Sequence, residues 1–580
     1  MGRNPHQNTN PGTHSGKNLI MQYTGSNKPV VKLLLEQCFI HGIKQVVIAP
    51  GSRNAPLIIS FANHPGFTCY SIPDERSAGF YALGMARQLN EPVAVVCTSG
   101  TAVLNLAPAL TEAYYQEIPV IAITADRPPE WIDQEDGQTI RQEFIFQNHI
   151  RSSVSLPSGL QDCDLMNARA MLDQALVKAH GYPKGPVHIN VPFHEPLYET
   201  QSWSFEVQTG VFEPQIKSNY AEVKSEVLQQ VSLFQKILII VGVKLPNKEI
   251  EQWLNRLADN KKFVVLAPAS ANIRGANILN LAEALALSLN ANQDLSLKPD
   301  VLISFGGPVV SKATKQWLRS IKPFIHFDVD ENPEQVNTYE SLSLKITGNP
   351  ILVLHDLLAT PEKNMEYQKL WQVLNQKVVD KQTEFNTTCP WSDYSIYQIF
   401  FDWLTFPVDL HLANSTPVRY AELFNKHPMI NYFGNRGTSG IDGSTSTAAG
   451  AALVSGKATW LLTGDIAFVY DSNAFWNRHL PDNLKVIVIN NQGGNIFRLI
   501  PGPDSTEQLE SFFETRQTAQ IEKLCQAFQV NYLSANNKDE LIQGLEQLKN
   551  SSTCTILEVF TDATISAGQF KKLYQQYRSL

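Results

Sequence analysis

The sequence predicts an α/β protein of three domains, each with a mostly parallel central sheet flanked by helices. Two observations support this prediction. Runs of four to seven apolar residues, rich in Val and Ile, recur along the chain and end at Gly, Asp, Asn or Ser. Runs without polar alternation are typical of strands buried on both faces, as in parallel sheets. Longer amphipathic stretches separate the runs, and this repeated strand–helix–strand order indicates an α/β fold.

The apolar runs give the strands in chain order. Strands are expected at 45–50, 92–97, 119–126 and 186–191, then at 237–242, 263–267, 301–306 and 324–328, and finally at 460–463, 486–490 and 555–560. The amphipathic stretches 78–89 and 167–179 are expected to be helices between strands.

Two stretches interrupt this rhythm and mark the domain boundaries. Residues 202–223 show no clear period, and residues 361–392 are polar, with one helix expected before a loop that ends at Cys389-Pro390. Each resulting domain has a size suited to one sheet. The predicted division is a disordered tail at 1–20, a first domain at 21–205, a central domain at 206–360 and a third domain at 361–580.

Composition excludes several classes of protein. The chain has 580 residues with 47 basic and 55 acidic side chains, a net charge of −8, which argues against a protein that coats nucleic acid. No apolar run approaches the roughly 20 residues of a membrane span. The seven cysteines are scattered without a Cys-x-x-Cys pair, as expected of reduced thiols, so the predicted location is cytoplasmic.

The sequence does not match either of two common nucleotide-binding motifs. No Gly-x-Gly-x-x-Gly opens a helix, so a dinucleotide-binding fingerprint is absent. The stretch from Gly450 to Ala458 resembles a phosphate-binding loop, but it has Ala where a metal-binding Ser or Thr is needed. It also lies in an Ala-rich helical stretch, and we reject it.

A stronger signal is Gly464-Asp465 followed by Asn490-Asn491. Asp465 and Asn491 each follow an apolar run, and the 26 positions between them suffice for a crossover and the next parallel strand. A carboxylate, an amide oxygen and a loop carbonyl suit Mg²⁺, and Gly493 lets the backbone bend to supply that carbonyl. Because Asp and Asn also favour turns, the spacing alone fits a pair of strand-end turns equally well.

This pattern resembles the metal motif of thiamine diphosphate (ThDP)-dependent enzymes, although Ile466 stands where many members have Gly. Within that group, long strings resemble the synthases of menaquinone biosynthesis that make 2-succinyl-5-enolpyruvyl-6-hydroxy-3-cyclohexene-1-carboxylate (SEPHCHC). The match is good in the first and third domains and poor in the middle one. The matching strings are APGSRNAPL (49–57), DERSAGFYALG (74–84), TSGTAVLNLAPAL (98–110), TADRPPEWID (124–133), GQTIRQ (137–142), NRGTSGIDGSTSTAAG (435–450), GDIAFVYDSNA (464–474) and NNQGGNIF (490–497).

The resemblance implies a fold and a reaction. The fold is that of ThDP-dependent enzymes, with a pyrimidine-binding domain at 21–205, a central domain at 206–360 and a diphosphate-binding domain at 361–580. The implied enzyme is a transferase that decarboxylates 2-oxoglutarate and adds the succinyl carbanion equivalent to isochorismate, releasing CO₂. Its cofactors would be ThDP and Mg²⁺, with Mn²⁺ as an alternative ion.

The resemblance also assigns roles to residues. Glu75, at a predicted helix start, would be the catalytic carboxyl on the cofactor's aminopyrimidine, and Ile441 would support the bent cofactor. The full cofactor set is Glu75, Ser439, Ile441, Gly464, Asp465 and Asn491, with Asp465, Asn491 and Gly493 on the metal. Both substrates are dianions, which arginine recognises bidentately. The implied substrate residues are Ser52, Arg53, Arg127, Gln138, Lys312, Ser415, Arg419, Arg436, Ile496 and Phe497; Ala313, beside Lys312, stands where the family often has arginine.

The resemblance further implies a homodimer or a dimer of dimers, because Glu75 and the metal ligands of such enzymes meet across a subunit interface. One alternative is another ThDP-dependent 2-oxo acid enzyme, such as an acetolactate synthase or a simple decarboxylase, which would have little use for four substrate arginines. The other is a non-catalytic binding subunit, which should have lost Glu75 or the metal ligands.

Overall fold

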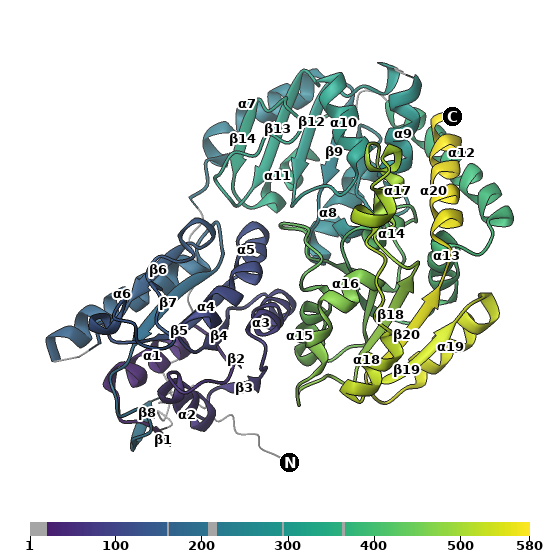
Figure 1. The fold of residues 1–580 in the computed structure, drawn as a ribbon. Helices are drawn as coiled ribbons and strands as arrows, with labels where there is room; N and C mark the ends of the chain where they lie inside the picture. Colours follow the sequence, from purple (N-terminus) through teal and green to yellow (C-terminus); the bar gives the residue numbers. More distant parts are fainter. Residues whose placement is uncertain (1–19, 159–161, 207–216, 293–294, 362–365) are drawn as a thin grey trace, which may run out of the picture.

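The structure is a computed structural model that describes residues 20–158, 162–206, 217–292, 295–361 and 366–580 (Figure 1). It contains three six-stranded sheets and a two-stranded antiparallel ribbon of β1 (Ile20–Ser26) and β8 (Thr200–Glu206). The predicted disordered tail, apart from Ile20, lies outside the described residues.

The first sheet is parallel and has the strand order β3-β2-β4-β5-β7-β6. Its strands are β2 (Gln45–Ile48), β3 (Thr68–Ser71), β4 (Val93–Cys97), β5 (Val120–Asp126), β6 (Ser152–Ser155) and β7 (Val187–Pro192). Its helices are α1 (Pro29–Ile40), α2 (Ala55–Asn63), α3 (Glu75–Leu89), α4 (Thr101–Asn105), α5 (Ala107–Gln116) and α6 (Asp162–His180).

The middle sheet is also parallel, in the order β11-β10-β9-β12-β13-β14. Its strands are β9 (Ile237–Val241), β10 (Phe263–Leu266), β11 (Ile278–Leu279), β12 (Val301–Phe305), β13 (Ile325–Asp330) and β14 (Leu344–Thr347). Its helices are α7 (Tyr220–Leu233), α8 (Lys248–Asp259), α9 (Ala282–Asn292), α10 (Lys312–Ile321) and α11 (Pro350–Leu357).

The third sheet has the order β16-β15-β17-β18-β20-β19, again parallel. Its strands are β15 (Val408–Leu412), β16 (Ile430–Phe433), β17 (Thr459–Gly464), β18 (Leu484–Asn490), β19 (Asn531–Ala535) and β20 (Thr555–Phe560). Its helices are α12 (Glu366–Thr388), α13 (Asp393–Trp403), α14 (Thr416–Ala421), α15 (Ser444–Ser455), α16 (Asp465–Tyr470), α17 (Ile496–Leu499), α18 (Ile521–Phe528), α19 (Lys538–Asn550) and α20 (Ala563–Arg578).

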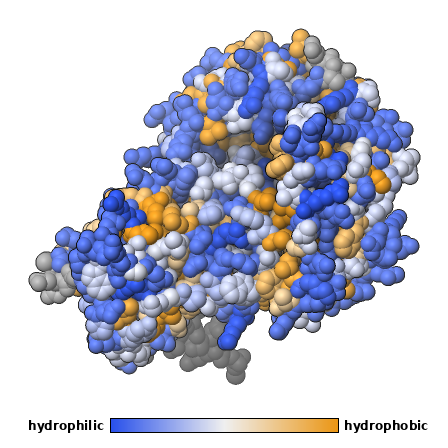
Figure 2. All heavy atoms as spheres, viewed as in Figure 1, coloured by the Kyte–Doolittle hydropathy of each residue, from blue (hydrophilic) through white to orange (hydrophobic). Residues whose placement is uncertain are grey.

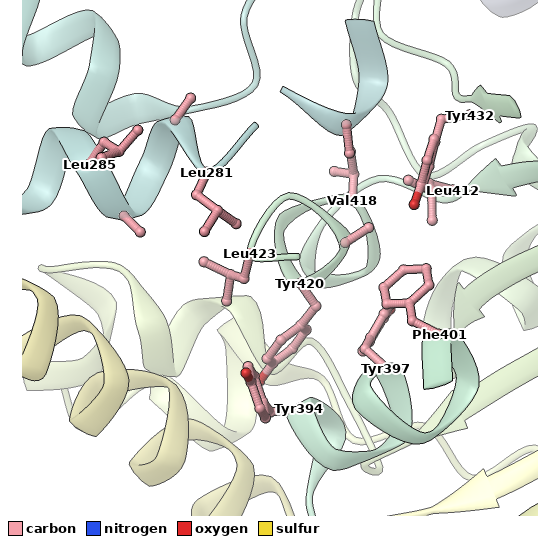
Figure 3. Close-up of a cluster of buried hydrophobic side chains, with 14 of the residues drawn as sticks. Leu281, Leu285, Tyr394, Tyr397, Phe401, Leu412, Val418, Tyr420, Leu423 and Tyr432 are labelled. Carbon is pink, nitrogen blue, oxygen red and sulfur yellow. The ribbon is translucent and has the colours of Figure 1, made fainter. Parts of the chain in front are cut away.

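Shared hydrophobic cores place the third sheet between the other two. Alternate side chains of a strand point to opposite faces of its sheet. Val486 of β18 joins a buried cluster with Val95 of the first sheet, whereas Ile487 joins one with Leu302 of the middle sheet. Figure 3 shows part of the cluster that contains Ile487, where Leu281, just before α9, lies near Leu423 of the third domain. The three sheets therefore form one packed body (Figure 1).

Helices α3 and α15 join the first and third domains at close range. A Cβ on Gly84 would lie 2.1 Å from the carbonyl oxygen of Thr447, and one on Gly450 would lie 2.2 Å from that of Tyr81. Glycine is therefore required at both positions for the two backbones to meet. Gly450 serves helix packing, which agrees with our rejection of a phosphate-binding loop there.

The structure confirms the predicted α/β class and every predicted strand, with ends that shift by at most two residues. It also confirms a helix in 361–392, but α12 continues to Thr388, so Cys389-Pro390 begin the following loop instead of ending one. The predicted helices at 78–89 and 167–179 are present in longer form, as α3 and α6. The residue-level domain boundaries stay predictions.

Candidate active site

Glu75 is the first residue of α3, which follows an edge strand of the first sheet. Asp74 caps the helix, because its side chain accepts a hydrogen bond of 3.0 Å from the backbone N–H of Ser77. Burial raises the pKa of the Glu75 carboxyl above its ordinary value. This carboxyl therefore keeps its proton to higher pH than a surface glutamate does.

Glu75 lines a cavity of about 300 Å³ whose lining residues all come from the first domain. The predicted residues Ser52 and Gln138 share this cavity with it. The remaining lining residues follow the carboxyl ends of β2 and β4 or lie on α4, and they are Pro50, Gly51, Thr98, Ser99, Thr101, Ala102 and Asn105. Parallel sheets bind ligands at this edge.

Arg53 and Arg127 lie close to the same edge. Arg53 is 1% exposed and donates a 2.9 Å hydrogen bond to the carbonyl oxygen of Phe193, while its Nε has no partner among the described residues. Arg127 donates a 2.9 Å hydrogen bond to the carbonyl oxygen of Gly137, next to Gln138. The structure thus brings the predicted polar residues of the first domain together.

Asp465 and Asn491 follow β17 and β18, which are adjacent and parallel, as the spacing predicted. Both side chains are buried, with exposed fractions of 1% and 6%. Burial raises the pKa of Asp465 to about 7. Nearby, Gly493 has a φ of 153°, and a Cβ there would lie 2.9 Å from the carbonyl oxygen of Glu514, so glycine is needed at this bend.

The free oxygens at these strand ends fit a metal ion. Asp465 Oδ2 and Asn491 Oδ1 are buried and have no hydrogen-bond partner within the described part of the chain. Asn491 Nδ2 donates to Asp393 at 2.8 Å, which leaves its oxygen as the free acceptor. Buried oxygens without partners carry a desolvation cost that a hard cation such as Mg²⁺ removes.

Asp393 is a residue that our sequence analysis missed. It is fully buried, and it also accepts hydrogen bonds from Thr561 Oγ1 at 2.6 Å and Ser566 Oγ at 3.0 Å. In the sequence it is only an acidic residue in the first turn of a helix, which Ser392 caps. No group of three or more His, Cys, Asp or Glu residues arranged for a metal occurs in the described ranges, so a metal here would rely on amide and backbone oxygens as well.

The loop between β16 and α15 carries Ser439, which is exposed, and Ile441, which is half-buried. Glu112 of α5 holds this loop, because its carboxylate accepts 2.7 Å hydrogen bonds from the backbone N–H groups of Gly437 and Thr438. Glu112 is 1% exposed. No sequence pattern indicates this role, since a glutamate in a helix is ordinarily a surface residue.

Two predicted arginines follow the first two strands of the third sheet, β15 and β16. Arg419 of α14 donates a hydrogen bond to the carbonyl oxygen of Ser415, and Arg436 Nη1 donates one of 2.6 Å to Asn414 Oδ1. Burial lowers the pKa of both guanidinium groups. Lys312, the first residue of α10, is exposed.

The predicted apolar wall lies beside the metal loop. Ile496 and Phe497 begin α17, and the ring of Phe497 is 5.5 Å from that of Phe513. Gly494 N donates to the carbonyl oxygen of Glu514 at 2.7 Å, which joins this wall to the loop that carries Gly493.

Three candidate residues have a left-handed backbone that non-glycine residues rarely adopt. Gln138 has a φ of 58°, Ser439 of 65° and Ser415 of 75°. Such conformations are concentrated at functional sites, where the surrounding structure maintains them.

A larger cavity, of about 500 Å³, lies where the strand order of the middle sheet reverses, between β9 and β12. Arg436 and Gly437 of the third domain and Glu117 of the first domain also line it. Among the residues that the structure describes, no helix has the length and apolar character needed to cross a membrane.

Family models match both outer domains. Residues 29–149 match the description "Thiamine pyrophosphate enzyme, N-terminal TPP binding domain", and residues 415–559 match "Thiamine pyrophosphate enzyme, C-terminal TPP binding domain". The first range contains Glu75 and the second contains Asp465 and Asn491.

Similar curated proteins carry one name, 2-succinyl-5-enolpyruvyl-6-hydroxy-3-cyclohexene-1-carboxylate synthase. The protein of Flavobacterium psychrophilum is 40% identical over 93% of this chain and 97% of its own length. That of Desulfotalea psychrophila is 37% identical over 92% of this chain and 98% of its own. A solved benzoylformate decarboxylase of Polynucleobacter necessarius shares the fold, with a TM-score of 0.67 and 16% identity, over 92% of this chain and 98% of that chain.

Proposed function

The chain belongs to the family of SEPHCHC synthases, which are ThDP-dependent enzymes, and on this basis we propose that it joins 2-oxoglutarate to isochorismate with loss of CO₂, a step of menaquinone biosynthesis. The observation that carries the proposal is the pair of unpartnered buried oxygens on Asp465 and Asn491. They lie in the range that matches the C-terminal cofactor-binding domain.

The residues present fit the cofactor and its metal. Asp465, Asn491 and the backbone at Gly493 would hold Mg²⁺ or Mn²⁺, and Gly464, Ser439 and Ile441 would contact ThDP. When bound, ThDP supplies the nucleophilic carbon and the electron sink for decarboxylation of a 2-oxo acid. Glu75, in its partly desolvated cavity, would hold a proton at the aminopyrimidine ring.

The cationic residues support dicarboxylate substrates. Arg53, Arg127, Arg419 and Arg436 each donate a hydrogen bond to a neutral backbone or amide oxygen, which leaves their positive charges for substrate carboxylates. Within the described part of the chain, Arg53 also contacts the exposed carboxylate of Glu195 at 3.4 Å, and Arg127 lies 3.9 Å from that of Asp136. Ser52, Gln138 and Ser415 would add neutral hydrogen bonds, and Ile496 and Phe497 an apolar wall.

We also propose a homodimer or a dimer of dimers as the active assembly. The cavity of Glu75 is lined by the first domain alone, so a cofactor bound there needs its metal-binding half from elsewhere. Leu104, which is 46% exposed, lies on α4 beside the lining residues Ala102 and Asn105. Figure 2 shows hydrophobic side chains gathered on the first and third domains, as expected of an association surface. The six described cysteines are free, which supports a cytoplasmic location.

The test is consumption of isochorismate by the pure protein, with ThDP, Mg²⁺ and 2-oxoglutarate each omitted in turn. We expect consumption only when all three are present. Release of CO₂ from 2-oxoglutarate with isochorismate untouched would replace the proposal with another ThDP-dependent decarboxylase or carboligase. Binding of ThDP without either reaction would favour a non-catalytic subunit.

A further inference from the structure

One glutamine side chain is fully buried in a largely exposed loop of the first domain. The loop connects β5 to β6 and carries the predicted substrate residues Arg127 and Gln138. Gln142 is 0% exposed, although its neighbours Arg141 and Glu143 are both exposed. A buried amide needs hydrogen-bond partners, since an unsatisfied one carries a large desolvation cost. The partners of Gln142 therefore show what this side chain holds in place.

The amide of Gln142 makes three hydrogen bonds. Its Nε2 donates to the carbonyl oxygen of Ala125 at 3.0 Å and to Asn190 Oδ1 at 2.9 Å. Its Oε1 accepts from the backbone N–H of Gly100 at 2.9 Å. A backbone carbonyl can only accept and a backbone N–H can only donate, so these partners fix the orientation of the amide. The side chain must therefore supply a donor and an acceptor at once, which neither a carboxylate nor an apolar chain does.

One of these partners ties Gln142 to the edge of the Glu75 cavity. Gly100 directly precedes α4, whose first residue, Thr101, lines that cavity. Gly100 has a φ of 84°, and a Cβ there would lie 3.3 Å from the backbone of Gln138, which packs directly against it. The glycine that accepts Gln138 at the cavity is thus the glycine that Gln142 holds.

The other two partners tie the end of the loop to its beginning. Ala125 is in β5, two residues before Arg127, and Asn190 is in the adjacent strand β7. Asn190 Nδ2 donates to Asp126 Oδ2 at 2.8 Å, and Asp126 Oδ1 accepts from the backbone N–H of Arg127 at 2.7 Å. Asn190 and Asp126 are each 2% exposed. A buried chain of hydrogen bonds therefore runs from Gln142 to the backbone of Arg127, and loss of one member leaves the others unsatisfied.

The outer part of the loop is held in a different way. Arg127 Nη2 donates to the carbonyl oxygen of Gly137, next to Gln138, at 2.9 Å. The same guanidinium is proposed to bind a substrate carboxylate, which would compete with this contact. The hydrogen bonds of Gln142 do not involve that guanidinium, so they hold the loop independently of it.

We propose that Gln142 is a positioning residue of the substrate site, which fixes the loop that carries Arg127 and Gln138 against Gly100 at the edge of the Glu75 cavity. Gln142 is not among the residues that line this cavity, so it acts through the other two. A loop that is fixed before the substrate arrives loses less entropy on binding it. The proposal rests on the proposed function, which gives Arg127 and Gln138 their substrate.

The test compares wild type with Q142M and Q142N, with ThDP and Mg²⁺ present. Methionine keeps the length of glutamine but not its hydrogen bonds, and asparagine keeps an amide that is one methylene shorter. We expect Q142M to raise the KM for at least one of the two substrates about tenfold and to change kcat by less than about threefold, because the residues that lose their support bind substrate. Q142N should lie between Q142M and wild type, and it decides the question by itself if Q142M does not fold.

Amide hydrogen exchange gives a readout that does not depend on turnover. In Q142M the backbone N–H of Gly100 loses its acceptor and the loop loses its buried support. Exchange in the peptides that cover Gly100 and residues 127–142 should therefore accelerate by about tenfold or more, without a similar change in the middle domain.

Q368M is the matched control, because Gln368 of α12 is 8% exposed and also donates to two backbone carbonyl oxygens, those of Ala258 at 2.5 Å and Phe263 at 3.0 Å. Both Q142M and Q368M should lower the thermal midpoint, since each removes hydrogen bonds from buried backbone groups. Q368M should keep both KM values and the exchange rates of residues 127–142.

If Q142M keeps both KM values within about twofold of wild type, the proposal is wrong, and Gln142 only stabilises the fold as Gln368 does. Failure of wild type to consume isochorismate would instead refute the proposed function. Hydrogen exchange then decides the role of Gln142: unchanged exchange in residues 127–142 of Q142M overturns the proposal, and faster exchange in Q142M but not in Q368M retains Gln142 as the residue that positions this loop.

Discussion

The first and third sheets have the same strand order but carry different chemistry. When the strands of each sheet are numbered in chain order, both sheets have the spatial order 2-1-3-4-6-5. The helix after the second strand, α3 in one and α15 in the other, meets its counterpart at Gly84 and Gly450. The shared topology fixes which edge of each sheet can bind a ligand.

The residues that directly follow corresponding strands account for the different chemistry of the two sheets. The third and fourth strands of the third sheet are followed by Asp465 and Asn491, whereas those of the first sheet are followed by Thr98 and Arg127. Only the first pair offers the oxygens of a cation site. Topology therefore positions both sites, and the strand-end residues determine what each can bind.

The largest expected effect comes from the strand-end carboxylate. D465A should abolish Mg²⁺-dependent binding of ThDP, weakening it at least a hundredfold, because it removes the only charged oxygen of the proposed metal set. Fluorescence titration with ThDP, with and without Mg²⁺, measures this. The thermal midpoint of the protein without cofactor should not fall, since D465A removes a buried carboxylate without a partner on Oδ2. Unchanged affinity for ThDP would show that Asp465 is not part of a metal site, so the third sheet would not differ from the first in this respect.

Glu75 should behave differently, because the role proposed for it is proton transfer rather than binding. E75Q is expected to lower kcat by about a hundredfold or more while ThDP affinity stays within about threefold, since the amide keeps the shape of the carboxyl but cannot exchange its proton. Steady-state kinetics and a ThDP titration on one preparation separate the two effects. Normal turnover by E75Q would show that Glu75, and with it the first sheet, has no catalytic role.

The sequence predicted the interior strands better than the edges, for a physical reason. The two end strands of every six-stranded sheet, β3 and β6, β11 and β14, and β16 and β19, were all missed. They are short or carry polar residues, as in Ser152–Ser155, because one side of an edge strand has no neighbour. An apolar run marks only a strand that is covered on both faces.

The site was predictable where function depends on residues in a local motif. Asp465 and Asn491 lie at adjacent strand ends as their spacing predicted. Glu112 and Asp393 could not be found in this way, because each acts through residues distant in the chain. Glu112 holds Gly437 and Thr438 from another domain, and no local pattern encodes such a contact.

A substitution at the helix crossing should destabilise the whole protein. In G450A the new Cβ would lie 2.2 Å from the carbonyl oxygen of Tyr81, which forces the helices apart at a cost of about 1–3 kcal/mol. G568A is the control, because Gly568 is in α20 with nothing within 4 Å of its Cβ position, and Ala there should stabilise by about 0.5–1 kcal/mol. Thermal unfolding measures both. Equal midpoints would mean that the two domains do not depend on this contact.

The smallest expected effect concerns how the two crossing helices are capped. In α3 the cap is local, since Asp74 accepts from Ser77 N, whereas in α15 the equivalent N–H, on Ser446, donates to Asp471 at 2.7 Å from a later helix end. A local cap is impossible in α15 because its N-cap is Gly443, where a Cβ would lie 2.4 Å from the ring of Phe80. The third domain therefore uses a fully buried carboxylate for a task that the first domain performs with the half-buried carboxylate of Asp74.

Burial raises the pKa of Asp471 to about 7, from an ordinary value of 3.8. Between these values the unfolded chain has already lost the proton that the folded protein keeps, so this carboxyl's contribution to the free energy of unfolding declines as pH rises from about 4 to about 7 and is constant above that. D471N cannot ionise and retains an oxygen for Ser446 N. The midpoint of wild type should therefore fall relative to that of D471N as the pH is raised from 5 to 8. A difference independent of pH would show that the distant cap is as insensitive to ionisation as a neutral one.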